Sequence, residues 1–412
     1  MRRGRIRAWS QAAASGFEAL GVRNFRLFWS GQLISLTGTW MQTTAQAWLV
    51  LQLTNGSPFA LGVVITLQYI PVMLFALFGG VLADRLPKRK TLVATQTLLM
   101  IQASIFGVLV AVGAIQLWHV YVLAVAQGLI TAVDNPVRQA FIYEMVGREV
   151  LVNAVGLNSM TFQGARIFGP ALAGVVIQWI GIAPVLIVNA ISFIPVIGAL
   201  LLMDEKALFT GAMTVDGSML MRLKEGVTFA RRTPLLFAIL IFTAFIGMFG
   251  FNFTVITPLV ADNVLKTDAA GFGLLSAAMG VGALGAALGV AYMRRITMRQ
   301  MLLSGAVFGV FLGTLALALN FWLSMLLFVI VGFTGIASAT IASSLLQLNT
   351  PEQLRGRVLS INLLLTMGST PIGGFFVGTV AQVAGVAPAL LICGVLCLVG
   401  VGLSAGYSAR TA

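Results

Sequence analysis

The sequence predicts an all-α membrane protein in which twelve transmembrane helices form two pseudo-symmetric six-helix bundles. Of the 412 residues, 59% are hydrophobic and only 9% are charged, whereas a soluble chain carries about a quarter charged residues. The mean hydropathy of +0.99 leaves few side chains suited to water. This composition excludes a soluble enzyme, a disulfide-rich secreted domain and a disordered chain.

Twelve apolar segments are each long enough to cross a bilayer, which requires about 20 helical residues. The basic residues at the start of the chain look like the beginning of a signal peptide. The apolar stretch that follows is too long for cleavage, so it is interpreted as a retained first span. The predicted spans are residues 27–53, 59–83, 91–113, 117–137, 156–179, 182–203, 234–260, 271–293, 299–320, 322–348, 359–383 and 386–407.

The longest polar interruption, residues 204–233, divides the spans into six and six. Within it, Leu220, Leu223, Val227 and Ala230 recur at helical spacing, which predicts an amphipathic helix on the membrane surface. We therefore expect a cytoplasmic N-terminal segment over 1–26, a bundle over 27–203, this linker over 204–233, a second bundle over 234–407 and a cytoplasmic tail over 408–412.

The positions of the basic residues predict the topology. With the N-terminus inside, all of the 25 Lys and Arg except Lys266 and Arg166 fall in cytoplasmic segments. The positive-inside rule then predicts a multi-pass protein of the inner membrane with both termini in the cytoplasm. Because topology accounts for the net charge of +13, nucleic-acid binding is not needed to explain it.

An internal repeat indicates that the two bundles are related. After the fourth and the tenth spans, the chain carries a Glu, then an Asn early in the next span, then a Pro followed by a Gly. Two homologous bundles around one pathway suit alternating access. The matched residues are Glu149, Asn158, Pro170 and Gly174 in the first half and Glu352, Asn362, Pro371 and Gly374 in the second.

The loop between the second and third spans reads Gly80-Val-Leu-Ala-Asp84-Arg85-Leu-Pro87-Lys88-Arg89. It resembles the signature loop G-x-x-x-D-R-x-G-R-R of the major facilitator superfamily, with Pro87 in place of the family Gly. The segments DNPVRQAF, GARIFGPALAG, LKEGVTFARRTPLL and LRGRVLSIN resemble its transmembrane-secretion-effector branch, which includes enterobactin exporters and macrolide-efflux proteins. The resemblance implies the major facilitator fold and a rocker-switch exporter, often driven by proton antiport.

Two departures speak against proton coupling by the usual route. Ala124 stands where many drug/proton antiporters have Arg, and Ala173 interrupts their G-P-x-x-G-G motif. For gating, we expect Asp84 to approach the eleventh span near Leu359 and Ser360 when the cytoplasmic side closes, because a helix N-terminus attracts a carboxylate. Arg138 and Arg357 are its candidate ion partners. The predicted gating residues are Gly80, Asp84, Arg85, Lys88, Arg89, Arg138 and Arg357.

Polar residues form stripes along the first and fourth spans. Their spacing of three or four residues puts each set on one helical face. Such groups also join helices by hydrogen bonds, so packing remains the alternative for each of them. The resemblance implies that spans one, four, seven and ten line the pathway. The candidate substrate-binding residues are Ser35, Thr39, Gln42, Gln46, Gln127, Thr131, Arg166, Phe245, Phe249, Asn252, Thr334 and Ser338.

Arg166 is the one cation well inside a span, and an intramembrane charge is costly enough to indicate function. We expect Asp134, near the cytoplasmic end of the fourth span, to be its partner. The pair could be a static salt bridge or could serve substrate or protons. Asp134 is the only acid near the pathway apart from boundary residues such as Asp84, so it is the candidate proton-coupling residue.

Enzyme and cofactor signals are weak. Gly280, Gly282 and Gly285 spell G-x-G-x-x-G, but no strand precedes them, so they indicate close helix packing and not dinucleotide binding. His119 is the only histidine, and no Cys or carboxylate cluster accompanies it. We therefore expect no cofactor, no metal and no enzymatic activity.

The leading hypothesis is a monomeric secondary active exporter of a small, partly hydrophobic compound such as a drug, an antibiotic, a siderophore or a secreted metabolite. An aromatic pair with amides suits such a substrate better than a sugar. Its partners would be the lipid bilayer, the small-molecule substrate and protons as the candidate coupling ion. The alternatives are a metabolite importer and, from another class, a non-transporting membrane sensor or enzyme.

Overall fold

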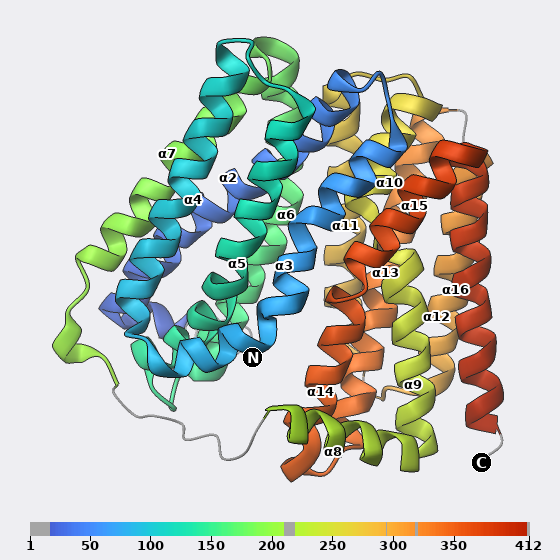
Figure 1. The fold of residues 1–412 in the computed structure, drawn as a ribbon. Coiled ribbons are helices and arrows are strands. Elements are labelled where there is room, and N and C mark those ends of the chain that lie inside the picture. The colour runs from blue at the N-terminus through green and yellow to red at the C-terminus, as the bar shows by residue number, and fades with distance from the viewer. Residues whose placement is uncertain (1–16, 210–218, 294, 318–319, 410–412) are drawn as a thin grey trace, which may run out of the picture.

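The computed structural model describes residues 17–209, 219–293, 295–317 and 320–409, except for the side chains of 76–85, 219–224, 352–353 and 367. The regular elements in these ranges are all helices, which confirms the all-α prediction (Figure 1). Eleven of the described segments are long and apolar enough to cross a membrane. A twelfth, α2 (Arg23–Leu53), has 31 residues but is less apolar, since buried amides such as Gln32 and Gln42 lie along it.

The first bundle consists of six helices joined by short turns. Gly147 and Gly181 end two of these helices with positive φ, a conformation that residues with a Cβ atom rarely adopt. The helix that begins at Leu117 runs to residue 146, past the predicted limit of 137, because its last turns remain helical beyond the apolar stretch. The helices are α2 (Arg23–Leu53), α3 (Pro58–Arg85), α4 (Lys88–Ala111), α5 (Leu117–Val146), α6 (Leu151–Ile180) and α7 (Ile182–Leu201).

The second bundle follows the linker helix and contains two composite spans. One is made of α9, two π-helical turns and α10, and the other is made of α14 and α15. The elements are α8 (Met219–Arg232), α9 (Pro234–Phe245), η3 (Ile246–Gly250), α10 (Phe253–Leu259), η4 (Val260–Val264), α11 (Ala269–Ala291), α12 (Met298–Thr314), α13 (Phe321–Leu348), α14 (Glu352–Met367), α15 (Thr370–Ala384) and α16 (Val386–Ala409).

The two composite spans correct the expectation of continuous helices over 234–260 and 359–383. Their interruptions pack against each other, because η3 contacts both α14 and α15. Gly247 lies against the carbonyl of Leu365, and Gly373 lies against the carbonyl of Met248, so a Cβ atom at either glycine would collide with backbone. Pro371, in the first turn of α15, lacks the N–H that a continuous helix would need.

The two bundles meet mainly at one end. We call the end that carries α8 the linker end, and the opposite end the far end. The main contacts between the halves join α3 to α15 and α6 to α11, with the aromatic pairs Trp48–Phe272 and Phe59–Phe375 beside them at 5.9 and 5.8 Å between ring centroids. Toward the linker end the bundles diverge (Figure 1).

The linker helix α8 packs on the second bundle. It contacts α14 and α9, and Glu225 forms an ion pair with Arg357. Gly226 lies against the side chains of Arg357 and Ile361, while Ala230 is fully buried. The helical part of the linker is therefore fixed to the second bundle, whereas its first residues bond to the first bundle, where Glu205 pairs with Arg89 and the backbone N–H of Phe209 donates to the carbonyl of Glu144.

Candidate functional site

A small cavity of about 70 Å³ lies between the two bundles, near the mid-length of α2 and α6. We call it the central pocket. The first bundle contributes residues of α2 and α6, and the second contributes residues of α11, α10 and the turn before it. The lining residues are Trp40, Thr43, Thr44, Ala47, Arg166, Pro170, Phe251, Phe253, Thr254, Thr257, Phe272, Ser276 and Met279.

Arg166 supplies the charge of the central pocket. Its guanidinium carbon lies 5.8 Å from the centroid of the Trp40 ring, within the range of a cation–π contact. Gly169 leaves room for Trp40, whose ring also packs edge-on against Phe162. The phenol of Tyr69, on α3, is close enough to the guanidinium for an electrostatic interaction. Among the described residues, no acid forms an ion pair with Arg166.

The hydroxyl groups of the central pocket differ in how they are satisfied. Thr43 and Ser276 each donate to the carbonyl one helical turn earlier, at 3.0 Å, so their oxygens face the pocket as acceptors. The hydroxyl of Thr257 is buried and has no partner among the described residues. A buried hydroxyl normally finds a partner, so Thr257 keeps a free hydrogen-bond donor at the wall of the pocket.

The polar stripe predicted on α2 turns into the first bundle and does not line the central pocket. Gln42 accepts a hydrogen bond of 2.7 Å from Asn189 on α7 and donates one of 3.3 Å to Gln102 on α4. Gln46 donates to Gln68 on α3 at 3.2 Å. These amides hold four helices together, which is the packing alternative expected for them. Ser35 is also buried, and its carbonyl accepts the hydroxyl of Thr39.

The stripe on α5 contains the buried acid. Asp134 accepts hydrogen bonds from Thr95 at 2.7 Å and from Gln96 at 2.8 Å, and it forms an ion pair with Arg138. The expected pairing of Asp134 with Arg166 is therefore wrong. Arg138 lies one turn away on the same helix, which makes it the nearer cation.

The remaining residues of the α5 stripe are not joined to that ion pair by any described hydrogen bond. The side-chain oxygen of Gln127 is buried with no partner in the described part of the chain. Thr131 is half-buried. Neither residue lines the central pocket, so their role as substrate ligands stays a prediction.

Phe245, Phe249 and Asn252 lie at the helix interruption around η3, whereas Thr334 and Ser338 lie on the unbroken helix α13. Phe249 packs against Phe245 and Phe376, with centroids 5.9 and 5.3 Å away. Asn252 donates to the carbonyl of Met248, and its own side-chain oxygen has no partner among the described residues. The hydroxyls of Thr334 and Ser338 bond to carbonyls of their own helix. Their neighbours Phe251 and Phe253, which the sequence did not single out, line the pocket instead.

The predicted gating residues lie at the linker end. The side chains of Gly80, Asp84 and Arg85 fall outside the described residues, and with them the expected approach of Asp84 to α14. The described cations are engaged within their own half or with the linker. Lys88 pairs with Glu144, Arg89 with Glu205, Arg138 with Asp134 and Arg357 with Glu225.

The far end is closed by two glycine crossings that the sequence analysis did not predict. On one side Gly174 meets Gly273, and on the other Gly62 meets Gly378. A Cβ atom at either Gly174 or Gly378 would lie 2.9 Å from the Cα atom of its partner, closer than side chains tolerate. Gly174 belongs to the repeated motif, which marks it in the sequence. Its partner was missed, because one sequence does not say which helix a glycine faces.

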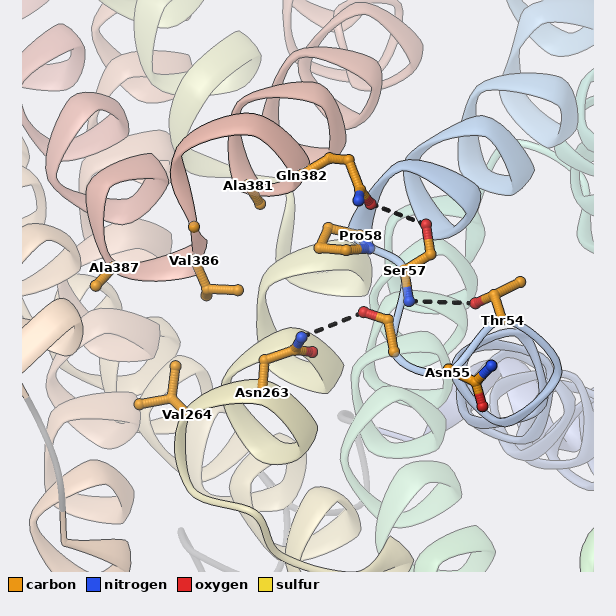
Figure 2. Close-up of a pocket in the computed structure, with 12 residues that line it drawn as sticks. Thr54, Asn55, Ser57, Pro58, Asn263, Val264, Ala381, Gln382, Val386 and Ala387 are labelled. Atoms are coloured by element: carbon orange, nitrogen blue, oxygen red, sulfur yellow. Dashed lines mark hydrogen bonds between the residues drawn. The ribbon is translucent and has the colours of Figure 1, made fainter.

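Polar contacts add to this seal at the outermost turns, where the structure has a pocket of about 630 Å³ (Figure 2). Ser57 donates to the side-chain oxygen of Gln382 at 2.9 Å, and Asn263 donates to the carbonyl of Gly56 at 3.2 Å. Both bonds join the two bundles. Deeper in, Thr66 donates to the carbonyl of Pro371 at 2.9 Å.

Comparison with known proteins gives consistent matches over almost the whole chain. Residues 14–410 match the family model of transmembrane secretion effectors. The staphyloferrin A transporter of Staphylococcus aureus is 25% identical over 90% of this chain and 92% of its own. The multidrug efflux pump Tap of Mycolicibacterium fortuitum is 27% identical over 84% and 87%, and the macrolide efflux protein A of Streptococcus pyogenes is 21% identical over 90% and 93%.

Solved structures share the fold. The nucleoside transporter NupG superimposes with a TM-score of 0.72 at 12% identity, covering 94% of this chain and 98% of its own. A bacterial homologue of the human lysosomal transporter Spinster, in an inward-facing and unoccupied conformation, gives 0.70 at 14% identity and covers 94% and 97%. At these identities the likeness extends to the arrangement of helices and not to the ligand.

Proposed function

The chain belongs to the transmembrane secretion effector family of the major facilitator superfamily, and on this premise we propose that it exports a small, partly hydrophobic compound by alternating access. As a member of that family it is a multi-pass membrane transporter of small molecules and not an enzyme. The observation that carries the proposal is the central pocket, which is lined by both bundles and lies next to the closed far end. A substrate held there would reach one side of the membrane at a time.

The basic residues support an orientation with the linker end in the cytoplasm of a bacterial cell. Lys88 and Arg89 begin α4, and Arg357 is in the first turns of α14. Both of these helix ends lie at the linker end (Figure 1), as the positive-inside rule requires of short cytoplasmic loops. In this orientation the far end is the outer side, and it is closed. An exporter loads its substrate in such a state, and we propose that it does so as a monomer in the inner membrane.

Export is favoured over uptake by the relatives and by the chemistry of the pocket. Two of the similar proteins are named as efflux proteins, one for several drugs and one for macrolides. The aromatic rings of Trp40, Phe251 and Phe272 offer apolar surface, and Thr43 and Thr257 offer hydrogen bonds. Such a lining suits a partly hydrophobic compound.

The gate and the coupling site remain proposals. We propose that the loop with Asp84 and Arg85 meets α14 when the linker end closes. Asp134 is the only acid less than one-tenth exposed among the described residues, so it is our candidate for proton coupling. Its partners Thr95, Gln96 and Arg138 all belong to the first bundle.

Cross-linking at the far end tests alternating access. Cysteines at Ser57 and Gln382 replace a hydrogen-bonded pair that joins the halves. They would be introduced into a variant in which Cys393 and Cys397, both buried in the second bundle, are replaced by Ser. Bridging them with a bifunctional methanethiosulfonate should stop transport, and a reductant should restore it, whereas each single-cysteine variant should stay active. Transport that continues in the cross-linked protein would contradict the mechanism.

The direction of transport needs a separate experiment. Everted and right-side-out membrane vesicles would be incubated with erythromycin and a panel of amphipathic compounds under an imposed pH gradient. Export predicts protein-dependent accumulation in everted vesicles. Accumulation only in right-side-out vesicles would make the protein an importer. Loss of gradient-driven transport in Asp134→Asn, with substrate exchange retained, would support coupling at that residue.

A further inference from the structure

We propose that the central pocket binds an organic anion, with its carboxylate or sulfonate group held by Arg166 and its apolar part against the aromatic rings. This inference rests on the proposed transport function and adds the charge of the substrate to it. The juxtaposition that carries it is an uncompensated cation, a free hydroxyl donor and several aromatic rings in one cavity.

Arg166 is placed where a lone cation is costly. It is near the middle of α6, whose 30 residues begin at the linker end. No hydrogen bond or ion pair of its guanidinium is found among the described residues, and its contact is the face of Trp40. A charge at this depth is usually paired or serves a function. An anionic group on the substrate would supply the missing counter-charge when the pocket is filled.

The acids whose side chains the structure describes are engaged elsewhere or lie far from Arg166. Asp134 is saturated by Arg138, Thr95 and Gln96. Asp268 caps α11 at the far end, where it accepts from the backbone of Gly271. Glu225 lies on the linker helix and pairs with Arg357, Asp262 lies beside Gly56 at the far end, and the other acids with described side chains lie in loops or at helix ends.

Asp84 is an acid of α3, and its side chain lies outside the described residues. It is on α3, the same helix as Tyr69, which lies near the guanidinium of Arg166. Fifteen residues separate Asp84 from Tyr69, which corresponds to about 22 Å along the helix. An intramolecular ion pair for Arg166 would therefore require a large displacement of α3.

Thr257 provides a second, independent sign of a ligand. It is only 2% exposed, lines the same cavity and has no partner for its hydroxyl in the described part of the chain. Thr257 comes from the second bundle and Arg166 from the first. An anion bound by both would connect the halves, since oxyanions accept several hydrogen bonds at once.

The aromatic rings around Arg166 and Thr257 determine the chemistry of the remaining part of the ligand. Phe251 stacks on Phe308, and Phe272 stacks on Trp48, so both rings are held in fixed orientations by their neighbours. They provide flat apolar surface and no charge. An amphipathic or aromatic anion satisfies the pocket, whereas a cation would meet the guanidinium with like charge.

The test is equilibrium binding to the full-length protein in nanodiscs of phosphatidylcholine, which adds no anionic lipid. The probes are 8-anilinonaphthalene-1-sulfonate and N-phenyl-1-naphthylamine, which share both ring systems and differ in the sulfonate. Empty nanodiscs provide the blank. The wild type should bind the sulfonate more tightly, Arg166→Gln should weaken its binding about tenfold or more, and Arg166→Lys should retain part of it.

Matched variants separate this inference from folding and from transport itself. Arg232→Gln removes an exposed cation of α8 and should leave binding of both probes unchanged, while Thr257→Val should weaken only the sulfonate. Equal binding of the two probes by the wild type, or unchanged sulfonate binding in Arg166→Gln, would overturn the inference. Export of an anionic compound that persists unchanged in Arg166→Gln would also overturn it and would leave the proposed transport function intact.

Discussion

The two bundles share a repeat but are held together in different ways. In the first, buried amides bond across helices, as Gln42 does with Asn189 and Gln102, and its spans are unbroken. In the second, two spans are interrupted and pack their breaks together around Gly247 and Gly373. Directional hydrogen bonds permit one geometry, while helix interruptions are places where spans bend. We therefore expect the first bundle to move as a unit and the second to deform.

The largest expected effect comes from the buried ion pair of the first bundle. Asp134→Ala leaves Arg138 without its partner at a site where the carboxylate is 1% exposed. Removing one member of a buried pair costs about 3–5 kcal/mol, so the unfolding temperature of the purified protein should fall strongly. Glu205→Ala is the control, because Glu205 pairs with Arg89 but is 62% exposed and such pairs contribute about 0–1 kcal/mol. Equal losses in both variants would contradict a rigid first bundle held by buried polar groups.

A second prediction concerns the crossing between the halves. Gly174→Leu would push side-chain atoms into the backbone of Ala269 and Gly273, and such overpacking costs about 1–3 kcal/mol. The cost falls on the state in which the far end is closed, so its population should drop about 5- to 150-fold. The measurement is the rate at which an impermeant maleimide labels Ser57→Cys from outside.

Gly164→Leu is the matched control for that crossing. Gly164 lies on the same helix, and a Cβ atom added there would have nothing within 4 Å. The substitution should leave the labelling rate near that of the parent. If the two glycines behave alike, the far-end seal does not depend on backbone contact.

A third and smaller effect compares the hydrogen bonds of the two bundles directly. Gln42→Leu removes bonds to Asn189 and Gln102 and leaves both partners buried, which should cost about 1–3 kcal/mol. Ser404→Ala removes a single bond, 2.8 Å long, to the carbonyl of Ala238 in the second bundle, and interhelical bonds in membranes average about 0.6 kcal/mol. Denaturation in mixed detergent would rank the two, and a larger loss for Ser404→Ala would reverse the comparison.

The fold was accessible from the sequence because apolar length and basic loops are local properties. Each span can be recognised from about 20 consecutive apolar residues. A motif such as Gly80 to Arg89 indicates the family from the sequence alone. The interruption at Gly247 was not predicted, because nothing in its own segment distinguishes a π-helical turn from a continuous apolar helix. It depends on Leu365 and Ser369, which lie more than a hundred residues later.

The site was harder to predict because it depends on helix rotation. The spacing of Ser35, Thr39, Gln42 and Gln46 predicts that they share one helical face, but it does not say which way that face points. In the structure that face is buried in the first bundle, and Trp40 and Thr43 face the pocket. The amides of Gln42 and Gln46, which were predicted to line the pathway, form hydrogen bonds inside the first bundle. Arg166 was predicted from the free-energy cost of a charge within a span, and it lines the central pocket.

The smallest expected effect is at the linker helix. Glu225 and Arg357 join α8 to α14, but their side chains are 47% and 32% exposed, and exposed ion pairs contribute about 0–1 kcal/mol. Glu225→Gln should therefore change the unfolding temperature little. Because α14 belongs to a composite span of the deformable bundle, the same variant should still raise hydrogen exchange in α8 and α14 and leave α4 and α5 unchanged. Exchange that rises equally in all four helices would mean that the two bundles respond as one body, and the distinction between a rigid and a deformable half would fail.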